Sequence, residues 1–201
     1  MQKENFFDRM YKNADKNNLS AIPWATLSAN VYLVKYLSTQ SQVQDKRALV
    51  IGCGLGDDAL ALEAQGYTVD AMDISPSAIA LAKERHSESN VHFYVADIYD
   101  MPKESFEAYN FVYEGLTVQS LPREDRETII ATIAGLVKKG GTLLVYASMQ
   151  ADADNYGGPP WPLYEREFAL YETHGLVQKG KECEEEVKVI AAFKCCRVYS
   201  K

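Results

Sequence analysis

Short apolar runs alternate with amphipathic stretches along most of the chain. The runs are typical of strands buried on both faces of a sheet, and they lie at 48–51, from Tyr67 onward, and at 91–95, 110–113 and 142–146. The stretches between them have the spacing of helices and begin at Asp57, after Ser75 and at Arg123. Because strands and helices alternate, the pattern predicts a mostly parallel sheet with helices on both faces.

Residues at the ends of these helices support the assignment. Ser75 suits an N-cap, because its hydroxyl can accept a bond from a backbone N–H of the first turn, and Pro76 suits the first helical position. Gly66 suits the position that follows a helix, where a left-handed backbone is common. The pair Gly140 and Gly141 is expected to close the helix that spans 123–138.

Both ends of the chain add further elements. Helices are expected at 2–16 and 28–37 before the first strand, and at 163–173 after the last parallel strand. Two strand-like runs, 176–183 and 187–199, predict a hairpin that completes the sheet. The helix at 28–37 should bury an apolar stripe made of Val31, Tyr32, Val34 and Leu37.

These elements predict one domain of 201 residues, which is long enough for a single well-buried α/β core. The expected fold is a Rossmann-like α/β fold with a seven-stranded, mostly parallel sheet and an antiparallel C-terminal strand pair. Its expected parts are an N-terminal helical cap (1–40), a core (45–148), a long loop (149–162) and a C-terminal helix with a β-hairpin (163–201).

The residues that suggest chemistry follow the first two strands. Gly52, Gly54 and Gly56 come directly after the first strand and let backbone N–H groups approach a ligand closely. Asp73 ends the second strand, 21 positions after Gly52, which is near the roughly 20 expected for an acid that binds ribose hydroxyls. The pattern therefore predicts a nucleoside site.

The identity of the nucleoside follows from what the loop lacks. A dinucleotide fingerprint would place glycine where Asp57 stands, and no Gly-Lys-Ser/Thr sequence for a nucleotide phosphate follows. A carboxylate at that position suits a ligand that carries an ammonium group and no phosphate. S-adenosylmethionine (SAM) is such a ligand, and we expect it as the cofactor, with S-adenosylhomocysteine as its product.

Composition and charge limit the kinds of molecule that the protein is expected to bind. The net charge of −7 disfavours a nucleic-acid surface, and no apolar run approaches the roughly 18 residues of a membrane span. The first residues have no signal-peptide pattern, so a cytoplasmic location is expected. A monomer or a weak homodimer with a small-molecule substrate is the matching expectation.

Cysteine and histidine add no metal or redox site. The four cysteines have no C-x-x-C spacing and are expected to be reduced thiols, and Cys53 is expected to be a small side chain packed under the glycine loop. The three histidines match no ligand pattern, so no metal is expected.

Four motifs together resemble the class I SAM-dependent methyltransferases: IGCGLGDD (51–58), VDAMDIS (69–75), VADI (95–98) and YNFVYEG (109–115). A narrower resemblance, to the thiopurine S-methyltransferase-like branch, extends over the whole chain. It rests on FFDRMY with IPW (6–24), GLTVQSLP (115–122), YGGPPWPLYEREF (156–168) and RVY (197–199).

The resemblance implies roles for residues at matching positions. The glycine loop, with Cys53, would line the methionine part of SAM, Asp73 would bind the ribose, and Ile74 would pack on the adenine. The remaining residues implied to contact the cofactor are Trp24, Ala96, Asp97, Ile98 and Glu114. The residues implied to contact the methyl acceptor are Phe7, Tyr11, Thr117, Tyr156 and Trp161.

The expected reaction is transfer of the SAM methyl group to a small-molecule acceptor, for which a thiol or another soft nucleophile is the favoured class. A thiol, with a pKa of about 8.5, is partly ionised at neutral pH and needs no strong base, whereas an oxygen acceptor does. Glu114 is the only candidate for a catalytic residue, and the sequence assigns it no role.

Two other functions remain open, a SAM-binding regulator without turnover and an aminopropyltransferase-like enzyme. A lid is also expected, in which the segment with Trp24 and the loop 149–162 with Trp161 close over the acceptor.

Overall fold

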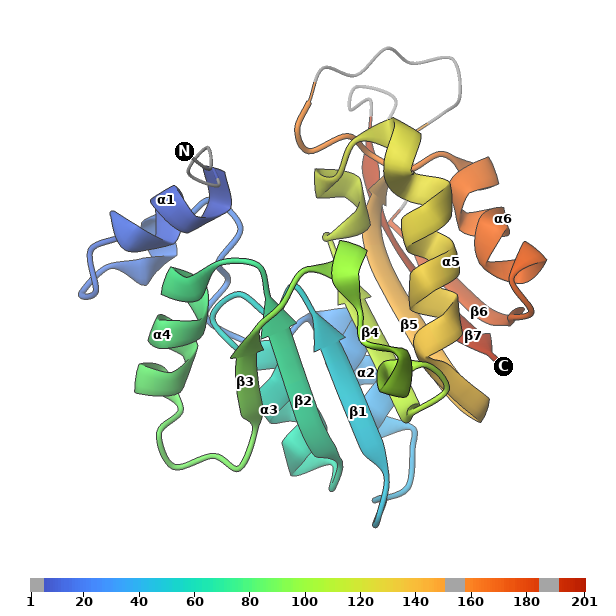
Figure 1. The fold of residues 1–201 in the computed structure, drawn as a ribbon, viewed down its shortest axis with the longest axis horizontal. Helices are drawn as coiled ribbons and strands as arrows, with labels where there is room; N and C mark the ends of the chain where they lie inside the picture. The colour runs from blue at the N-terminus through green and yellow to red at the C-terminus, as the bar shows by residue number, and fades with distance from the viewer. Residues whose placement is uncertain (1–5, 151–157, 185–191) are drawn as a thin grey trace. The chain divides into compact units, whose positions relative to one another are not determined.

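The structure, a computed structural model, describes residues 6–150, 158–184 and 192–201 (Figure 1). Its seven strands share one sheet in the order β3-β2-β1-β4-β5-β7-β6. The strands up to β5 pair in parallel where their register is given, and β7 runs antiparallel to both β5 and β6. The predicted Rossmann-like fold with an antiparallel C-terminal pair is therefore confirmed.

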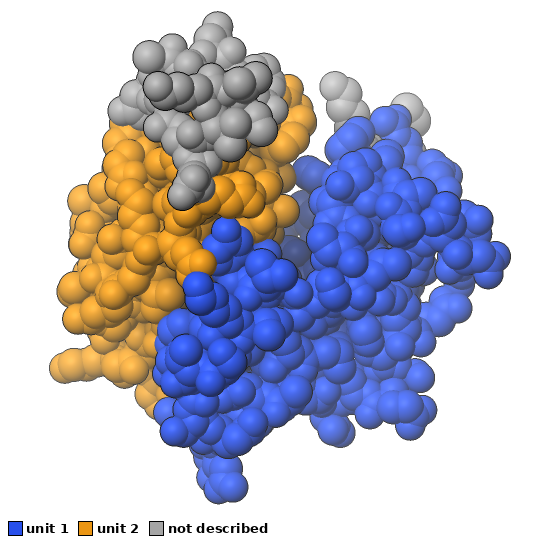
Figure 2. Space-filling model, turned by 180° about the vertical axis from the view of Figure 1, so that it is seen from behind, with its two compact units in different colours: residues 1–100 blue, residues 101–201 orange. Residues whose placement is uncertain are grey.

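The chain divides into two compact units, Met1–Asp100 and Met101–Lys201, which Figure 2 colours separately. The first unit contains three parallel strands and four α-helices. Its elements are α1 (Phe6–Lys12), α2 (Val31–Ser38), β1 (Arg47–Ile51), α3 (Asp57–Ala64), β2 (Thr68–Asp73), α4 (Pro76–Arg85) and β3 (His92–Val95).

The three strands of the first unit end at the same edge of the sheet. Their register pairs Ile51 with Met72 and Asp73 with Val95, so the loops that follow β1, β2 and β3 are neighbours. Helix α3 packs on β1 and β2, and α4 packs on β2 and β3 (Figure 1). The ligand side of an open parallel sheet is this edge, where the carboxyl ends of the strands lie.

The helix boundaries expected from local signals in this unit are confirmed. The Ser75 hydroxyl accepts a bond from the backbone N–H of Ala78, and Pro76 is the first residue of α4. Gly66 follows α3 with φ of +99°, where a Cβ would collide with the backbone carbonyl of Val43. Only glycine fits this turn without strain.

Two expectations for the N-terminal segment were wrong. The first helix ends at Lys12 rather than near residue 16, and the chain then turns. In α2 the buried side chains are Leu33 and Leu37, while Val31 and Val34 are 72% and 46% exposed. The Asn30 side chain caps the backbone N–H groups of α2, which fixes where the helix begins and hence which face is turned inward.

The second unit combines a parallel pair with an antiparallel sheet extension. Helix α5 packs on β4 and β5, and α6 lies beside α5 and packs on β6 (Figure 1). Its elements are β4 (Tyr109–Gly115), the short 3-10 helix η4 (Val118–Ser120), α5 (Arg126–Leu136), β5 (Val137–Met149), α6 (Glu165–Thr173), β6 (Val177–Cys183) and β7 (Phe193–Ser200).

The expected role of Gly140 and Gly141 at a helix end was wrong. Helix α5 ends at Leu136, and β5 begins at once with Val137, which pairs with Tyr109. The regular pairing of β4 with β5 resumes only at Thr142, so the glycines lie in an irregular stretch of the strand. Gly140 has φ of +77°, and its N–H donates to the carbonyl of Lys201.

The expectation that all four cysteines are reduced was also wrong. Cys183 and Cys195 lie directly opposite one another in the β6–β7 register and form a disulfide. Cys53 and Cys196 are free, as expected, and both are buried. Within the described ranges, no helix has the length and apolar character needed to cross a membrane.

Candidate functional site

The glycine loop between β1 and α3 is held in a tight turn. The backbone N–H of Cys53 donates to Met72 on β2 at 2.9 Å, and that of Gly56 donates to Cys53 at 2.9 Å. Gly54 and Gly56 have φ of +52° and +89°. A Cβ would lie 2.8 Å from the Tyr11 hydroxyl at the first position and 2.8 Å from the Phe93 ring at the second. The loop therefore requires glycine at both positions.

Asp73 joins this loop to the end of β2. One carboxylate oxygen accepts from the Gly54 N–H at 2.9 Å, and the other accepts from the Ser75 N–H at 2.9 Å. The side chain is buried, and burial raises the pKa of the carboxyl against the opposing effect of these N–H groups. Each oxygen keeps a further lone pair, so the arrangement fits the ribose hydroxyls of a nucleoside.

The other residues implied to contact the nucleoside follow β2 and β3. Ile74 is 41% exposed, and the Ala96 N–H donates to the backbone carbonyl of Asp73 at 3.1 Å. Asp97 uses one carboxylate oxygen to accept from the Tyr99 N–H at 3.0 Å, while Ile98 is buried. The two strand ends thus bring Asp73, Ile74 and Asp97 to one edge of the sheet.

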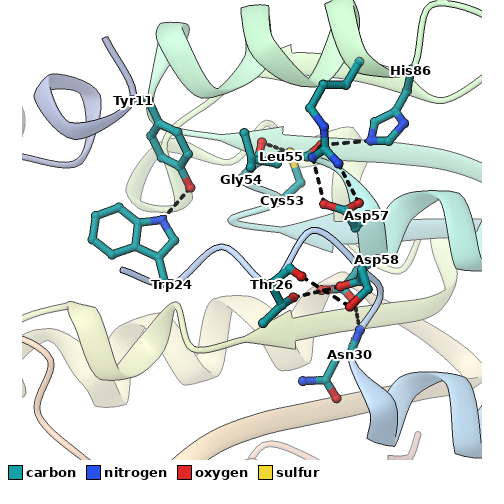
Figure 3. A network of polar contacts seen from close by, with 12 residues as sticks. Tyr11, Trp24, Thr26, Asn30, Cys53, Gly54, Leu55, Asp57, Asp58 and His86 are labelled. Atoms are coloured by element: carbon teal, nitrogen blue, oxygen red, sulfur yellow. Dashed lines mark hydrogen bonds and ion pairs between the residues drawn. The ribbon is translucent and has the colours of Figure 1, made fainter. Parts of the chain in front are cut away.

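An aromatic cluster formed by Phe6, Phe7, Tyr11 and Trp24 adjoins the glycine loop. The Trp24 indole N–H donates to the Tyr11 hydroxyl at 2.6 Å, and the two rings point toward one another (Figure 3). The ring centroids of Phe7 and Tyr11 lie 5.6 Å and 5.8 Å from that of Trp24. Three residues that the sequence assigned to cofactor and acceptor are therefore brought together.

Asp8 fixes this cluster to the end of β2. Its carboxylate accepts from the Ser75 hydroxyl at 2.7 Å and from the Ser77 N–H at 2.9 Å, at the start of α4. The bond from the Ser77 N–H is the main cause that lowers the pKa of Asp8. This contact could not be predicted from sequence patterns, because Asp8 and Ser75 are 67 positions apart.

The interpretation of Asp57 as a carboxylate available to a ligand was wrong. Arg85 donates to both of its oxygens, at 2.9 Å and 3.0 Å, in a bidentate pair. Asp58, the next residue, accepts from the Asn30 N–H at 2.7 Å (Figure 3). The negative charge of Asp57 is therefore compensated within the protein, and the preference for SAM rests on the rest of the loop.

In the second unit, Glu114 lies near the end of β4 and is fully buried. One carboxylate oxygen accepts from the N–H groups of Thr117 and Val118, at 2.6 Å and 2.9 Å, and the other has no partner among the described residues. Burial raises the pKa of Glu114 to about 7, although these N–H groups and the positive charge of Arg126 oppose the shift. Glu114 is thus a buried carboxyl and not a solvated strand end.

Arg126, which sequence reasoning missed, organises the loops of the second unit. Its guanidinium is 1% exposed and donates to Glu167 on α6 at 2.7 Å and to the carbonyl of Trp161 at 2.5 Å. The Trp161 N–H in turn donates to the carbonyl of Gln119 in η4 at 2.7 Å. Thr117 and Trp161 therefore stand in segments tied together after β4 and β5, whereas Tyr156 lies outside the described residues.

The fold and this site define a class of protein. One solved structure superposes with a TM-score of 0.73 at 17% identity, covering 96% of this chain and 89% of the other. Its title is "Conversion of a Disulfide Bond into a Thioacetal Group during Echinomycin Biosynthesis". Geranyl diphosphate C-methyltransferase from Streptomyces coelicolor A3(2), whose structure contains S-adenosylhomocysteine, gives a TM-score of 0.69 at 11% identity, covering 84% and 75%. The fold is that of the class I SAM-dependent methyltransferases.

The family follows from the sequence itself. The model of the thiopurine S-methyltransferase family matches residues 12–192, and the chain belongs to this family. A probable thiopurine S-methyltransferase of Yarrowia lipolytica is 25% identical over 170 residues, which cover 76% of this chain and 79% of that protein. Thiocyanate methyltransferase 1 of Arabidopsis thaliana is 29% identical over 145 residues, which cover 69% and 61%. The chain is a SAM-dependent methyltransferase, and the regulator and aminopropyltransferase alternatives are set aside.

Proposed function

We propose that this methyltransferase transfers the methyl group of SAM to a small acceptor whose nucleophile is sulfur or a similarly soft atom. When bound, SAM supplies an electrophilic methyl group on its sulfonium. The contribution of the protein is then to hold donor and acceptor in line and to exclude water. Positioning of this kind can lower a barrier by roughly 7–11 kcal/mol in favourable cases.

The cofactor would be held by the first unit. Asp73 would accept from the ribose hydroxyls, and the exposed side chain of Ile74 would cover one face of the adenine. Asp97 would accept from the adenine amino group through the carboxylate oxygen that the turn to Tyr99 does not use. Gly52, Gly54 and Gly56 would bring the backbone against the methionine part.

The observation that carries the acceptor proposal is the burial of Glu114. It is the one acid that the sequence nominates near the acceptor, and both of its oxygens lie in the interior of the protein. A general base must reach the proton that it removes, at hydrogen-bond distance or through one water. An acceptor that reacts without such a base, as a thiolate does, is therefore favoured over a phenol or an alcohol.

The printed names of two relatives support this choice. The relative from Yarrowia lipolytica is named for a thiopurine and that from Arabidopsis thaliana for thiocyanate, and both named compounds contain sulfur. The two compounds differ greatly in size and shape. What they share is a soft nucleophilic sulfur, and this shared chemistry is what we assign to the substrate of this chain.

We further propose that the acceptor is a small molecule rather than a nucleic acid or a membrane surface. The net charge of −7 supports this, since binding to phosphates needs basic surface. We propose a monomer or a weak homodimer as the working form. Gel filtration at several protein concentrations tests this form directly.

The test of the proposed function is a panel of acceptors offered with SAM. Small thiols and thiocyanate should yield S-methylated products and S-adenosylhomocysteine, identified by mass spectrometry. Phenols and amines of similar size are the comparison set. Turnover confined to phenols or amines would contradict the proposal. Asp73→Asn serves as the cofactor-site control, and Asp70→Asn, an acid on the same strand that pairs with Arg47, serves as its matched variant.

A further inference from the structure

The phenol of Tyr11 lies at the glycine loop with its donor capacity unused. Its side chain is 5% exposed, and its oxygen lies 2.8 Å from the position that a Cβ would occupy on Gly54. The oxygen accepts the indole N–H of Trp24 at 2.6 Å (Figure 3). Within the described residues, the hydroxyl donates to no other group. A buried O–H without an acceptor is costly, and it is expected to find one in the functional state.

The loop itself has few donors left for a ligand anion. The N–H groups of Cys53, Gly54 and Gly56 donate to Met72, to Asp73 and within the loop. Arg85, the cation beside this loop, is committed to both oxygens of Asp57. An anionic group placed against the loop therefore cannot use these donors, and a donor from outside the loop would add to its binding.

We propose that Tyr11 binds the carboxylate of the methionine part of the cofactor through its phenolic O–H. The inference rests on the proposed cofactor site and moves Tyr11 from the acceptor, where the family resemblance put it, to the cofactor. A carboxylate accepts hydrogen bonds only, which matches a phenol whose oxygen is already engaged by a donor. The ammonium group of the cofactor is itself a donor and does not complement this O–H.

The surroundings of Tyr11 keep it in the donor form. Burial, followed by the negative charge of Asp73, raises the pKa of the phenol well above its ordinary value, so it remains protonated at neutral pH. Trp24 fixes the direction of the phenol, and Asp8 fixes the segment that carries it to the start of α4. Trp24 therefore acts as a positioning residue for Tyr11.

The test compares two ligands on two variants by isothermal titration calorimetry. The ligands are S-adenosylhomocysteine and its decarboxylated analogue, which keeps the amine and lacks the carboxylate. Tyr11→Phe removes only the hydroxyl and should weaken S-adenosylhomocysteine roughly tenfold or more, as expected for a hydrogen bond to a charged group. It should change the affinity for the decarboxylated analogue by less than about twofold.

Trp24→Phe is the matched control, because it removes the indole N–H and leaves the Tyr11 O–H in place. This variant should still bind S-adenosylhomocysteine more tightly than the analogue, which Tyr11→Phe should not. Equal losses for both ligands in Tyr11→Phe, or no loss for either, would overturn the assignment of Tyr11 while leaving the methyltransferase proposal intact. Failure of the wild-type protein to bind S-adenosylhomocysteine would instead overturn the cofactor site itself.

Discussion

Asp73 in the first unit and Glu114 in the second occupy equivalent places, at or near the carboxyl end of a parallel strand. Each accepts two backbone N–H bonds, Asp73 from Gly54 in the glycine loop and from Ser75, and Glu114 from Thr117 and Val118 in the turn that follows it. Burial raises the pKa of each carboxyl. Asp73 uses one oxygen for each bond and is 7% exposed, whereas Glu114 uses a single oxygen for both and is fully buried. The same sequence signal, an acid at a strand end, thus leads to the proposed cofactor contact in one unit and to an interior carboxyl in the other.

The difference between the two acids arises from what packs around them. Around Asp73 the neighbours are a glycine loop and the backbone at the start of a helix. Glu114 is surrounded by the buried residues of the second unit, including Arg126 and Tyr171. The positive charge of Arg126 acts to lower the pKa of Glu114, and Glu114 adds to the effect of burial, which raises the pKa of Tyr171. Of the two acids, the one beside small residues is therefore the one that we propose as a ligand contact.

The largest effect should follow removal of Arg126, on which the surroundings of Glu114 depend. Arg126→Met leaves the Glu167 carboxylate and the carbonyl of Trp161 without their buried partner. Loss of one member of a buried pair costs about 3–5 kcal/mol of unfolding free energy, measured by urea denaturation. Arg123→Met is the matched control, because Arg123 is partly exposed and lies 3.8 Å from Glu167. Equal losses in the two variants would contradict the central place of Arg126.

Glu114 should make stability depend on pH in a definite direction. Its pKa is about 7 in the folded state against 4.5 ordinarily, so the folded state binds the proton more tightly. Its contribution to stability is full below about pH 4.5 and decreases as the pH rises to about 7, by about 3 kcal/mol in total.

The measurement is the difference in unfolding free energy between the wild type and Glu114→Gln across this pH range. Glutamine has the same shape and does not titrate, so the other ionisable groups cancel in the difference. The wild type should lose stability relative to the variant as the pH rises. A difference that is constant with pH would show that folding does not shift the pKa of Glu114, and it would contradict this prediction.

Local patterns predicted the first unit better than the second. The glycine loop, the Ser75 cap and Gly66 depend on neighbouring residues, and the structure confirms all three. Asp73 was identified by its distance in sequence from the glycine loop. The length of the strand–helix–strand unit determines this distance. These features could be predicted because each depends on only a few positions along the chain.

The remaining features depend on contacts between distant positions, for which a single sequence carries no signal. The pair formed by Asp57 and Arg85 spans 28 positions, and that of Arg126 and Glu167 spans 41. The disulfide between Cys183 and Cys195 follows from the register of the hairpin, which composition does not reveal. Structural disulfides are rare in reducing compartments, such as the expected cytoplasm. The disulfide predicts that only Cys53 and Cys196 carry free thiols, whereas a cytoplasmic location predicts that all four cysteines do.

The smallest of the three effects should be the loss of ligand affinity at Asp73. Asp73→Asn removes the charge that would accept the ribose hydroxyls, and the affinity for S-adenosylhomocysteine should fall at least roughly tenfold. Asp70→Asn, on the same strand but paired with Arg47 and His92, should leave the affinity unchanged. Calorimetry measures the affinity of both variants for S-adenosylhomocysteine. An unaltered affinity in folded Asp73→Asn would show that this residue is not part of the cofactor site.

We propose a division of roles in which Asp73 binds the cofactor and Glu114 stabilises the fold, so that methyl transfer to sulfur needs no buried base. Its most direct test is mass spectrometry of products formed from SAM with a deuterated methyl group and a small thiol. At a SAM concentration below saturation, the wild type and Glu114→Gln should form the labelled thioether at similar rates, and Asp73→Asn should form much less. Loss of the thioether in a folded Glu114→Gln variant, with Asp73→Asn still active, would contradict the account.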